Sequence, residues 1–316
     1  MTTEQKIALI TGANKGIGFE TARQLGARGM VVLVGARSDA RGKEAVAALR
    51  TEAIDAHAVR FDVTDDASVQ EAATWIEAEY DRLDVLVNNA GAPTISRQRS
   101  VPSTTDLGDM RAVYEINVFG VVRVTNAMLP LLRQAPAARI VNVSSEVGSI
   151  SSQTDPASPL SQMPASAQYP SSKAAVNMIT AMYAKELKDT PIKVNAANPG
   201  YCATDFNNNS GFRTAAQGAE SSVYLATLPD DGPSGIHWGH LWTTEGDGGY
   251  GVIGWLSVSA PISAPGSVPG SVPISAPAPT PSRFRPRLRL RRTHRARRRG
   301  PPRTRPPAAD HRSPAG

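Results

Sequence analysis

The sequence predicts an α/β fold: a doubly wound, parallel sheet with helices between its strands, in a single domain followed by a disordered C-terminal tail. Two observations predict the sheet. Short apolar runs alternate with helical patterns through residues 1–198, and a glycine-rich stretch, Thr11–Gly18, joins the first run to the first helix. A third observation sets the boundary: composition changes abruptly after Trp255, so residues 1–255 are predicted to be the domain and residues 256–316 the tail.

The apolar runs are predicted to form six parallel strands. In chain order these strands are Ile7–Ile10, Met30–Val34, Ala56–Phe61, Leu83–Val87, Arg139–Val143 and Ile192–Ala196. Helical spacing of apolar residues predicts helices over Phe19–Leu25, Ala40–Glu52, Val69–Tyr80, Asp106–Leu132 and Ala215–Leu228, and one more that ends at Lys188. Gly239–Trp242 is predicted as an edge strand, and the Ser- and Pro-rich residues 149–168 as a loop.

The glycine-rich stretch combines a strand, a loop and a helix in one short unit. The first amides of a helix are unpaired and lie at the positive end of its dipole, so a phosphate can bind there. Glycines at 12, 16 and 18 would let a pyrophosphate and the neighbouring strand approach closely. A tight turn is the alternative for a lone glycine loop, but the strand and helix around it favour a dinucleotide site of the Rossmann type.

The end of the second strand indicates which dinucleotide would bind. An acidic residue there would bind the adenosine ribose and repel a 2′-phosphate, whereas this chain has Ala36 followed by Arg37. Lys15 adds a cation within the glycine loop. Taken singly each could be a solvated surface charge, but together they favour NADP(H). Asp62 either caps the segment after it or reaches an adenine amine.

Tyr169 and Lys173 are four residues apart, which places them on one face of a helix. Pro170 suits the first helical position, so Tyr169 is predicted at the helix entrance. The pKa of a free tyrosine is near 10, and a neighbouring ammonium would favour the phenolate. Alone, such a pair is more often packing plus a solvated charge.

Together with the motifs around it, the pair makes the chain resemble the simple branch of the short-chain dehydrogenase/reductase family, and the Asn-Lys of its glycine loop is similar to the carbonyl reductases of that family. The matching pieces occur in the family's order and span residues 7 to about 245: Thr11–Gly18, Asn88–Gly91, Asn117, Ser145, Tyr169 with Lys173, and Asn198–Gly200.

The resemblance implies four catalytic residues. Tyr169 would exchange a proton with the substrate oxygen, and Ser145 would hydrogen-bond that oxygen. Lys173 would bind the nicotinamide ribose and lower the pKa of the tyrosine, and Asn117 would hold a water of the proton relay. Ser145 is chosen over Ser144 because the second serine matches the motif, and only one of two successive strand residues can face the site.

The resemblance also implies the cofactor-binding residues and the position of a substrate lid. The cofactor residues are Gly12, Asn14, Lys15, Gly16, Ile17, Gly18, Arg37, Asp62, Val63, Asn89, Ala90, Gly91, Tyr169, Lys173, Pro199, Gly200 and Thr204. The lid is predicted over 207–212. No metal ligands are expected, because His57, His237 and His240 lack ligand spacing and are read as surface or edge residues. The interval between Ser145 and Tyr169 is longer than is usual in the simple branch, which leaves the oligomeric state open.

The tail and the single cysteine bear on partners and location. Residues 283–312 hold thirteen arginines and one acid, so a tail of +12 within a chain of +6 leaves −6 for residues 1–255. A solvated, disordered appendage is the favoured interpretation of the tail, over polyanion binding or an artefact of the reading frame. The lone Cys202 and the absence of a signal-peptide pattern or a long apolar run lead us to expect a cytoplasmic protein with no membrane contact.

The function expected from the sequence is hydride transfer between NADP(H) and a small or medium carbonyl or alcohol compound. A catalytically silent NADP-binding sensor and a nucleic-acid-binding protein acting through the tail are the alternatives.

Overall fold

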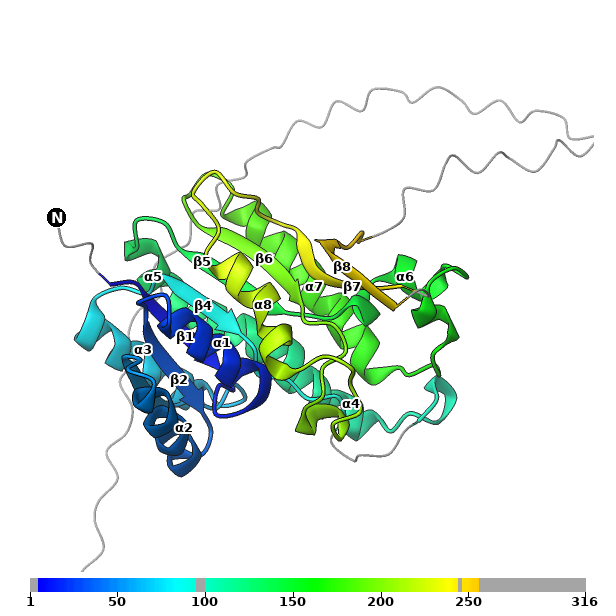
Figure 1. Cartoon of the computed structure of the whole chain (residues 1–316), viewed down its shortest axis with the longest axis horizontal. Coiled ribbons are helices and arrows are strands. Elements are labelled where there is room, and N and C mark those ends of the chain that lie inside the picture. Colours follow the sequence, from blue (N-terminus) through cyan, green and yellow to red (C-terminus); the bar gives the residue numbers. More distant parts are fainter. Residues whose placement is uncertain (1–4, 95–99, 244–245, 256–316) are drawn as a thin grey trace, which may run out of the picture. The chain divides into compact units, whose positions relative to one another are not determined.

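The computed structural model describes residues 5–94, 100–243 and 246–255, and these form one sheet with helices on both faces (Figure 1). The strand order is β3-β2-β1-β4-β5-β6-β7-β8, and all neighbouring strands are parallel except β7 and β8. The order reverses direction at β1, as in a doubly wound sheet. The predicted α/β fold is therefore confirmed; the predicted tail, 256–316, lies outside the described residues.

Each of the six predicted parallel strands is present, within two residues of its predicted ends. The strands are β1 (Ile7–Thr11), β2 (Val31–Ala36), β3 (Ala56–Arg60), β4 (Val85–Asn88), β5 (Arg139–Val143), β6 (Lys193–Asn198), β7 (His237–Thr243) and β8 (Gly246–Val252). Their central residues are buried on both sides of the sheet, which explains the continuous apolar runs.

Helices pack on both faces because successive strand residues point to opposite sides. The helices are α1 (Gly16–Gly26), α2 (Asp39–Thr51), α3 (Asp66–Tyr80), α4 (Leu107–Tyr114), α5 (Gly120–Gln134), α6 (Ile150–Thr154), α7 (Gln168–Glu186) and α8 (Ala215–Ala226). Leu9 and Leu33 belong to the core under α3, α5 and α7, whereas Ile10 and Val34 belong to the core under α1, α2 and α8. Figure 1 shows α1 and α8 together on one face of the sheet.

The predicted edge strand was wrong in its position in the sheet. β7 pairs with β6 on one side and with β8 on the other, so β8 forms the edge. Four glycines within 246–251 deprive β8 of the apolar alternation by which a strand is recognised in a sequence.

The helix predicted over Asp106–Leu132 is built of three segments rather than one. A π-helical turn, Glu115–Phe119, joins α4 to α5, and Pro130 lies in the last turns of α5. A π-turn inserts one residue into a helix, and such turns are frequent at functional sites.

The loop predicted over residues 149–168 contains α6 and a 3₁₀ turn, Pro159–Gln162. The prediction failed because two of the serines cap helices: the Ser149 hydroxyl accepts a hydrogen bond from the Ser152 amide, and the Ser158 hydroxyl accepts one from the Leu160 amide. Among the helices of the described ranges, none has the length and apolar character needed to cross a membrane.

Candidate active site

The glycine loop lies between β1 and α1, and its conformation and packing require glycine at three positions. Gly12 and Gly16 have φ of +65° and +59°, a region that favours glycine. A Cβ at Gly18 would lie 2.7 Å from the Gly12 carbonyl oxygen and would also clash with the Asn89 amide, so loop, helix and the segment after β4 can pack only around a glycine. The Asn89 side chain donates to the Thr11 carbonyl oxygen at 2.8 Å, which joins the ends of β1 and β4.

The first turn of α1 is open to a ligand. Lys15 is the residue that precedes the helix, and its side chain does not cap the helical amides. Its ammonium instead pairs with Asp205 at 2.7 Å, with both side chains more than half exposed. Asp205 begins a 3₁₀ turn, Asp205–Asn207, and Thr204 lies 3.7 Å from the Cβ position of Gly16.

The second predicted phosphate ligand, Arg37, differs from Lys15. It is exposed directly after β2 and makes no hydrogen bond or ion pair with any other residue that the structure describes. The Asp62 carboxylate accepts bonds from the amide and the hydroxyl of Thr64 at 3.0 and 2.8 Å, so one of its oxygens already stabilises the turn after β3.

All predicted cofactor residues outside α7 follow the carboxyl end of a strand or lie at the start of α1. Gly12, Asn14, Lys15, Gly16, Ile17 and Gly18 follow β1, Arg37 follows β2, Asp62 and Val63 follow β3, Asn89, Ala90 and Gly91 follow β4, and Pro199, Gly200 and Thr204 follow β6. The structure therefore gathers them along one edge of the sheet, the edge at which doubly wound folds bind ligands.

Tyr169, Ser145 and Lys173 converge at this edge. Tyr169 lies in the first turn of α7, one turn before Lys173, and a hydrogen bond joins its phenol to Ser145. The Lys173 ammonium donates to the Val143 carbonyl oxygen at 2.8 Å and lies 5.6 Å from the centre of the tyrosine ring. Strand β5 thus presents its last carbonyl, and Ser145 two residues beyond its end, to one face of α7.

Burial decides the protonation of this cluster. It raises the pKa of Tyr169 well above its usual value, although the hydrogen bond to Ser145 acts in the opposite direction. Burial also lowers the pKa of Lys173 to about 8. Desolvation of the phenolate is thus the largest influence on the Tyr169 pKa, and the expectation that Lys173 lowers this pKa stays a prediction.

The two serines after β5 have different surroundings. Ser144 is buried, and its hydroxyl donates to the Asn177 side-chain oxygen at 2.5 Å, whereas Ser145 contacts Tyr169. The structure places the second serine, the one selected from the sequence, beside the tyrosine.

Asn117 lies in the π-helical turn and is fully engaged with the protein. Its amide nitrogen donates to the Ala92 carbonyl oxygen and the Ser172 hydroxyl at 2.9 and 3.0 Å, and its oxygen accepts from the Ala92 amide at 2.8 Å. The side chain anchors the segment after β4 to α7. Gly91 borders both Asn117 and Lys173, since its Cβ position is 3.4 Å from the Asn117 oxygen and 3.8 Å from the Lys173 nitrogen.

The aromatic side chains around the site were not predicted from the sequence. Aromatic residues form only 5% of the chain, so the several that follow β6 were a signal that could have revealed them. The Phe206 ring meets the Tyr169 ring edge-on at 5.4 Å. Tyr201 stacks on Trp242 at 6.1 Å, and Phe212 contacts both. Of these, Phe212 falls within the predicted lid and Phe206 just precedes it.

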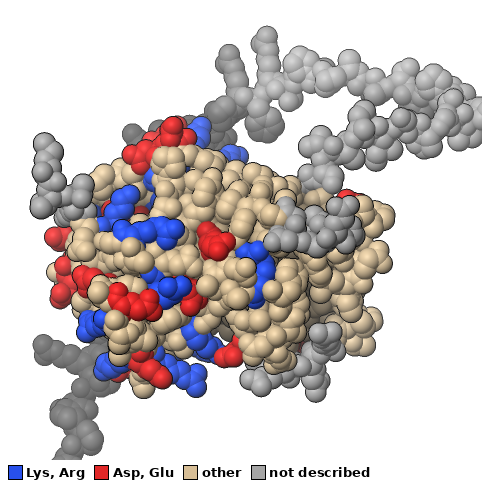
Figure 2. Space-filling model, viewed as in Figure 1, with Lys and Arg blue, Asp and Glu red and all other residues tan. Residues whose placement is uncertain are grey.

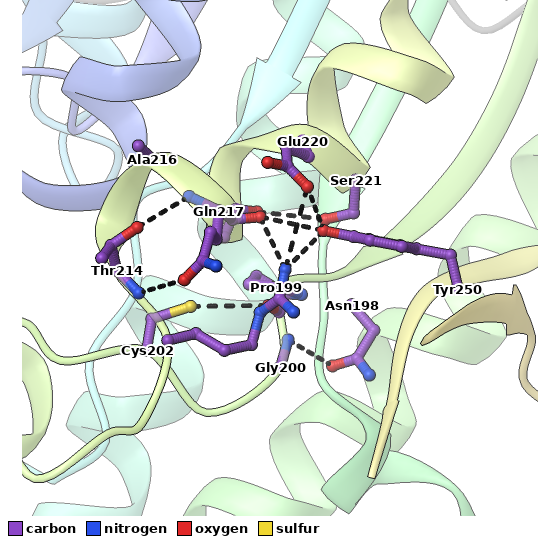
Figure 3. A network of polar contacts seen from close by, with 12 residues as sticks. Asn198, Pro199, Gly200, Cys202, Thr214, Ala216, Gln217, Glu220, Ser221 and Tyr250 are labelled. Carbon is purple, nitrogen blue, oxygen red and sulfur yellow. Dashed lines mark hydrogen bonds and ion pairs between the residues drawn. The ribbon is translucent and has the colours of Figure 1, made fainter. Parts of the chain in front are cut away.

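The segment after β6 is held by contacts to α8 and β8 (Figure 3). The Cys202 thiol donates to the Pro199 carbonyl oxygen at 3.4 Å, and burial raises the pKa of that thiol to about 11. Buried Arg213 donates to the Gln217 carbonyl oxygen at 3.0 Å and to the Tyr250 hydroxyl. Cys202 is thus a protonated packing residue rather than a nucleophile.

Two of the three histidines that were predicted to lie at the surface or at an edge are buried. His237 and His240 are fully buried rather than at the surface, because β8 and the segment after it cover β7. Burial and the charge of Lys173 lower the pKa of His237 to about 3, and its ring stacks on Trp255 at 5.4 Å. Within the described residues, no three His, Cys, Asp or Glu side chains are grouped so that they could hold a metal ion.

Comparisons with known proteins agree with this fold. The family model for the short chain dehydrogenases matches residues 6–212. A short-chain dehydrogenase of Penicillium roqueforti, anuI, is 41% identical over 70% of this chain and 88% of its own length, and (+)-neomenthol dehydrogenase of Capsicum annuum is 30% identical over 74% and 96%. The NADPH-bound carbonyl reductase from chicken fatty liver superposes with a TM-score of 0.64 at 27% identity, over 75% of this chain and 97% of that one. The chain therefore belongs to the short-chain dehydrogenase/reductase family of oxidoreductases.

Proposed function

We propose that this protein is an NADP(H)-dependent carbonyl reductase that acts on small or medium apolar carbonyl compounds and, in reverse, on the corresponding alcohols. The convergence of Tyr169, Ser145 and Lys173 at the carboxyl edge of the sheet carries the proposal. The family membership supports it, as does the NADPH in the carbonyl reductase to which the chain is similar.

The residues present fit a dinucleotide. The first turn of α1 has no side-chain cap, so its backbone amides remain available to a pyrophosphate, and the lack of a side chain at Gly18 lets α1 pack on the glycine loop and Asn89. Arg37 would pair with the 2′-phosphate and Lys173 would bind the nicotinamide ribose. When bound, the cofactor would supply or accept the hydride.

The protonation of Tyr169 suits carbonyl reduction. A phenol with a raised pKa carries its proton at neutral pH, so Tyr169 can give the proton to the carbonyl oxygen as the carbon gains a hydride and the carbonyl becomes an alcohol. Ser145, held beside the phenol, would hydrogen-bond the same oxygen and stabilise its developing charge. Lys173 would lower the energy of the phenolate that remains until a proton returns from solvent.

The surroundings of the site favour an apolar substrate. Phe206, Phe212, Tyr201 and Trp242 lie on the segment after β6 and on β7, and all four are at least partly exposed. Figure 2 shows that charged side chains on the visible face gather over the half of the sheet with α1 and α2, whereas the half with β7 and α6 is mainly uncharged. The cyclic terpenoid alcohol in the name of the Capsicum annuum relative is of this apolar class.

The test is a screen for NADPH oxidation with aldehydes, ketones and quinones, followed by three variants on a compound that is turned over. We expect Tyr169→Phe to retain NADPH affinity and lose most of kcat, and Ser145→Ala to lose about 100-fold in kcat. Ser144→Ala is the matched control, with an expected kcat within about threefold of the wild type. Comparable turnover in Tyr169→Phe would contradict the proton-donor role, and tight NADPH binding without turnover of any compound would favour a silent sensor.

A further inference from the structure

Asn198, the last residue of β6, makes three hydrogen bonds to backbone groups of three different segments. Its side-chain oxygen accepts from the amides of Glu146 and Gly200 at 3.1 and 3.4 Å, and its nitrogen donates to the His240 carbonyl oxygen at 2.6 Å. The side chain is 2% exposed. Figure 3 shows it turned toward Gly200 from the end of its strand.

The first of these segments carries the serine beside Tyr169. Glu146 follows Ser145 and begins a 3₁₀ turn, Glu146–Gly148. A Cβ at Gly148 would lie 2.6 Å from the Lys173 carbonyl carbon, so this turn packs directly on the backbone of α7. A shift of the Glu146 amide would therefore move Ser145 relative to Tyr169 and Lys173.

The second segment is the loop predicted to flank the nicotinamide. Gly200 has φ of +76°, and its Cβ position is 2.9 Å from Arg213 Cδ, so the loop is tightly enclosed. The third is β7, which also holds the serine turn at another point: the Trp242 amide donates to the Glu146 carboxylate at 3.2 Å. Asn198 thus sits where the serine turn, the nicotinamide loop and β7 meet.

We infer that Asn198 is a positioning residue, which fixes Ser145 and the Pro199–Gly200 loop relative to each other; the inference rests on the proposed function. Replacing the side chain by a methyl group leaves one buried carbonyl and two partly buried amides without their partner, and each would shift to find another. Misplacement of a catalytic group by about 1 Å can cost about 100-fold in rate.

The same strand offers a matched control. Asn195 is 1% exposed and bonds backbone in the same manner: its oxygen accepts from the Ile236 amide at 3.0 Å and its nitrogen donates to the Pro233 carbonyl oxygen at 2.9 Å. These bonds join β6 to the segment before β7 and touch neither Ser145 nor Gly200. We therefore expect Asn195→Ala to destabilise the protein about as much as Asn198→Ala does, without affecting the site.

The experiment compares Asn198→Ala, Asn195→Ala and Asn198→Asp in the full chain by thermal unfolding, NADPH affinity, kcat and KM, and hydrogen exchange of the Glu146 and Gly200 amides. We expect both alanine variants to lower the melting temperature, but only Asn198→Ala to lower kcat by about 10- to 100-fold and to speed exchange at the two amides. Asn198→Asp keeps the oxygen that accepts from both amides, so it should protect them, but its second oxygen is an acceptor facing the His240 carbonyl oxygen; we therefore expect a smaller loss of kcat than in Asn198→Ala.

Equal losses of kcat in the two alanine variants, or an unchanged kcat in Asn198→Ala, would overturn the inference. So would Asn198→Asp with protected amides and a kcat as low as that of Asn198→Ala. If Asn198→Ala does not fold, the inference is tested with Asn198→Asp and with hydrogen exchange in the wild type. Rapid exchange of the Glu146 and Gly200 amides in the wild type would overturn the inference. Exchange needs no substrate, so absence of turnover in the wild type contradicts the proposed function and leaves this readout intact.

Discussion

Arg37 and Lys15, the two basic residues predicted to bind the cofactor, differ in whether another side chain already pairs with them. Arg37 follows β2 and makes no polar contact with the described residues, whereas Lys15 is paired with Asp205. Arg37, which has no partner among the described residues, lies where a 2′-phosphate is expected, so its replacement should affect NADPH and NADH binding differently.

We therefore expect Arg37→Asp to weaken NADPH binding by about 10- to 100-fold, because a charge-assisted bond is lost and a repulsive charge is added. NADH binding should change little. Fluorescence titration of both cofactors measures the difference. Arg28→Asp is the control, since exposed Arg28 follows α1 at the amino edge of the sheet; equal losses for NADPH and NADH in Arg37→Asp would refute the phosphate role.

His237 couples stability to pH. Its folded-state pKa of about 3 lies below the unfolded value near 6.5, so the unfolded chain binds the extra proton first. The stability contributed by the neutral ring is fully present above pH 6.5 and is lost as the pH falls toward 3. Burial and the nearby Lys173 ammonium are the causes.

We expect His237→Phe, which preserves a ring against Trp255, to flatten the pH dependence of the free energy of unfolding between about pH 6 and pH 4, by up to about 1.4 kcal/mol per pH unit. Urea unfolding at several pH values measures it. A variant with the same slope as the wild type would show that the ring does not titrate as its burial implies.

At the scale of elements, the turn Asp205–Asn207 lies between the two halves of the site. Asp205 pairs with Lys15 of the glycine loop, and Phe206 packs on Tyr169. A phosphate bound at Lys15 would lie next to the Asp205 carboxylate, whose like charge opposes its binding and competes for the same ammonium.

Asp205→Asn should therefore raise NADPH affinity a few-fold at low salt, and the gain should shrink as salt screens the exposed pair. Asp189→Asn, which removes the partner of another exposed lysine, Lys188 after α7, is the control. Fluorescence titration with NADPH at two salt concentrations tests this prediction. A loss of affinity in Asp205→Asn would mean that Asp205 supports cofactor binding rather than competing with it.

Elements differed in how readily the sequence revealed them. β1, β2 and β4 are apolar except for Thr11 and Asn88 at the ends of β1 and β4, because both faces of these strands are buried, so the strands were predicted well. β8 was missed because glycines replace its apolar residues, and α6 because its capping serine looked like a loop residue. The motif residues of the site were found because each stands beside a strand or helix signal, whereas Asn198 and Phe206 were not assigned roles because only the three-dimensional contacts distinguish them.

At the scale of the molecule, the described body extends to Trp255. Ile253 is 4% exposed, the Gly254 carbonyl oxygen accepts from the Ser149 hydroxyl at 2.9 Å, and Trp255 stacks on His237. Residues 253–255 are therefore held against the folded body by one buried side chain, one hydrogen bond and one ring contact, and the boundary predicted after Trp255 stays a prediction.

A chain that ends at residue 255 should keep the melting temperature of the full chain, whereas one that ends at Val252 should lose roughly 5 °C or more, because a buried isoleucine is removed. Thermal unfolding of the two truncated chains beside the full chain measures this. A drop on removal of 256–316 alone would contradict the predicted tail and place folded structure beyond Trp255.

The π-helical turn between α4 and α5 has a consequence for how this site could arise. One surplus residue rotates everything after it by about 100°, a little more than a quarter of a revolution, relative to a regular helix. The apolar stripes of α4 and α5 are thereby put out of phase, and Asn117 falls in the stretch where the phase changes. A side chain that a regular helix would direct elsewhere is brought to the Ala92 backbone by a single inserted position, so one small change in length, without any change in chemistry, is sufficient to aim it.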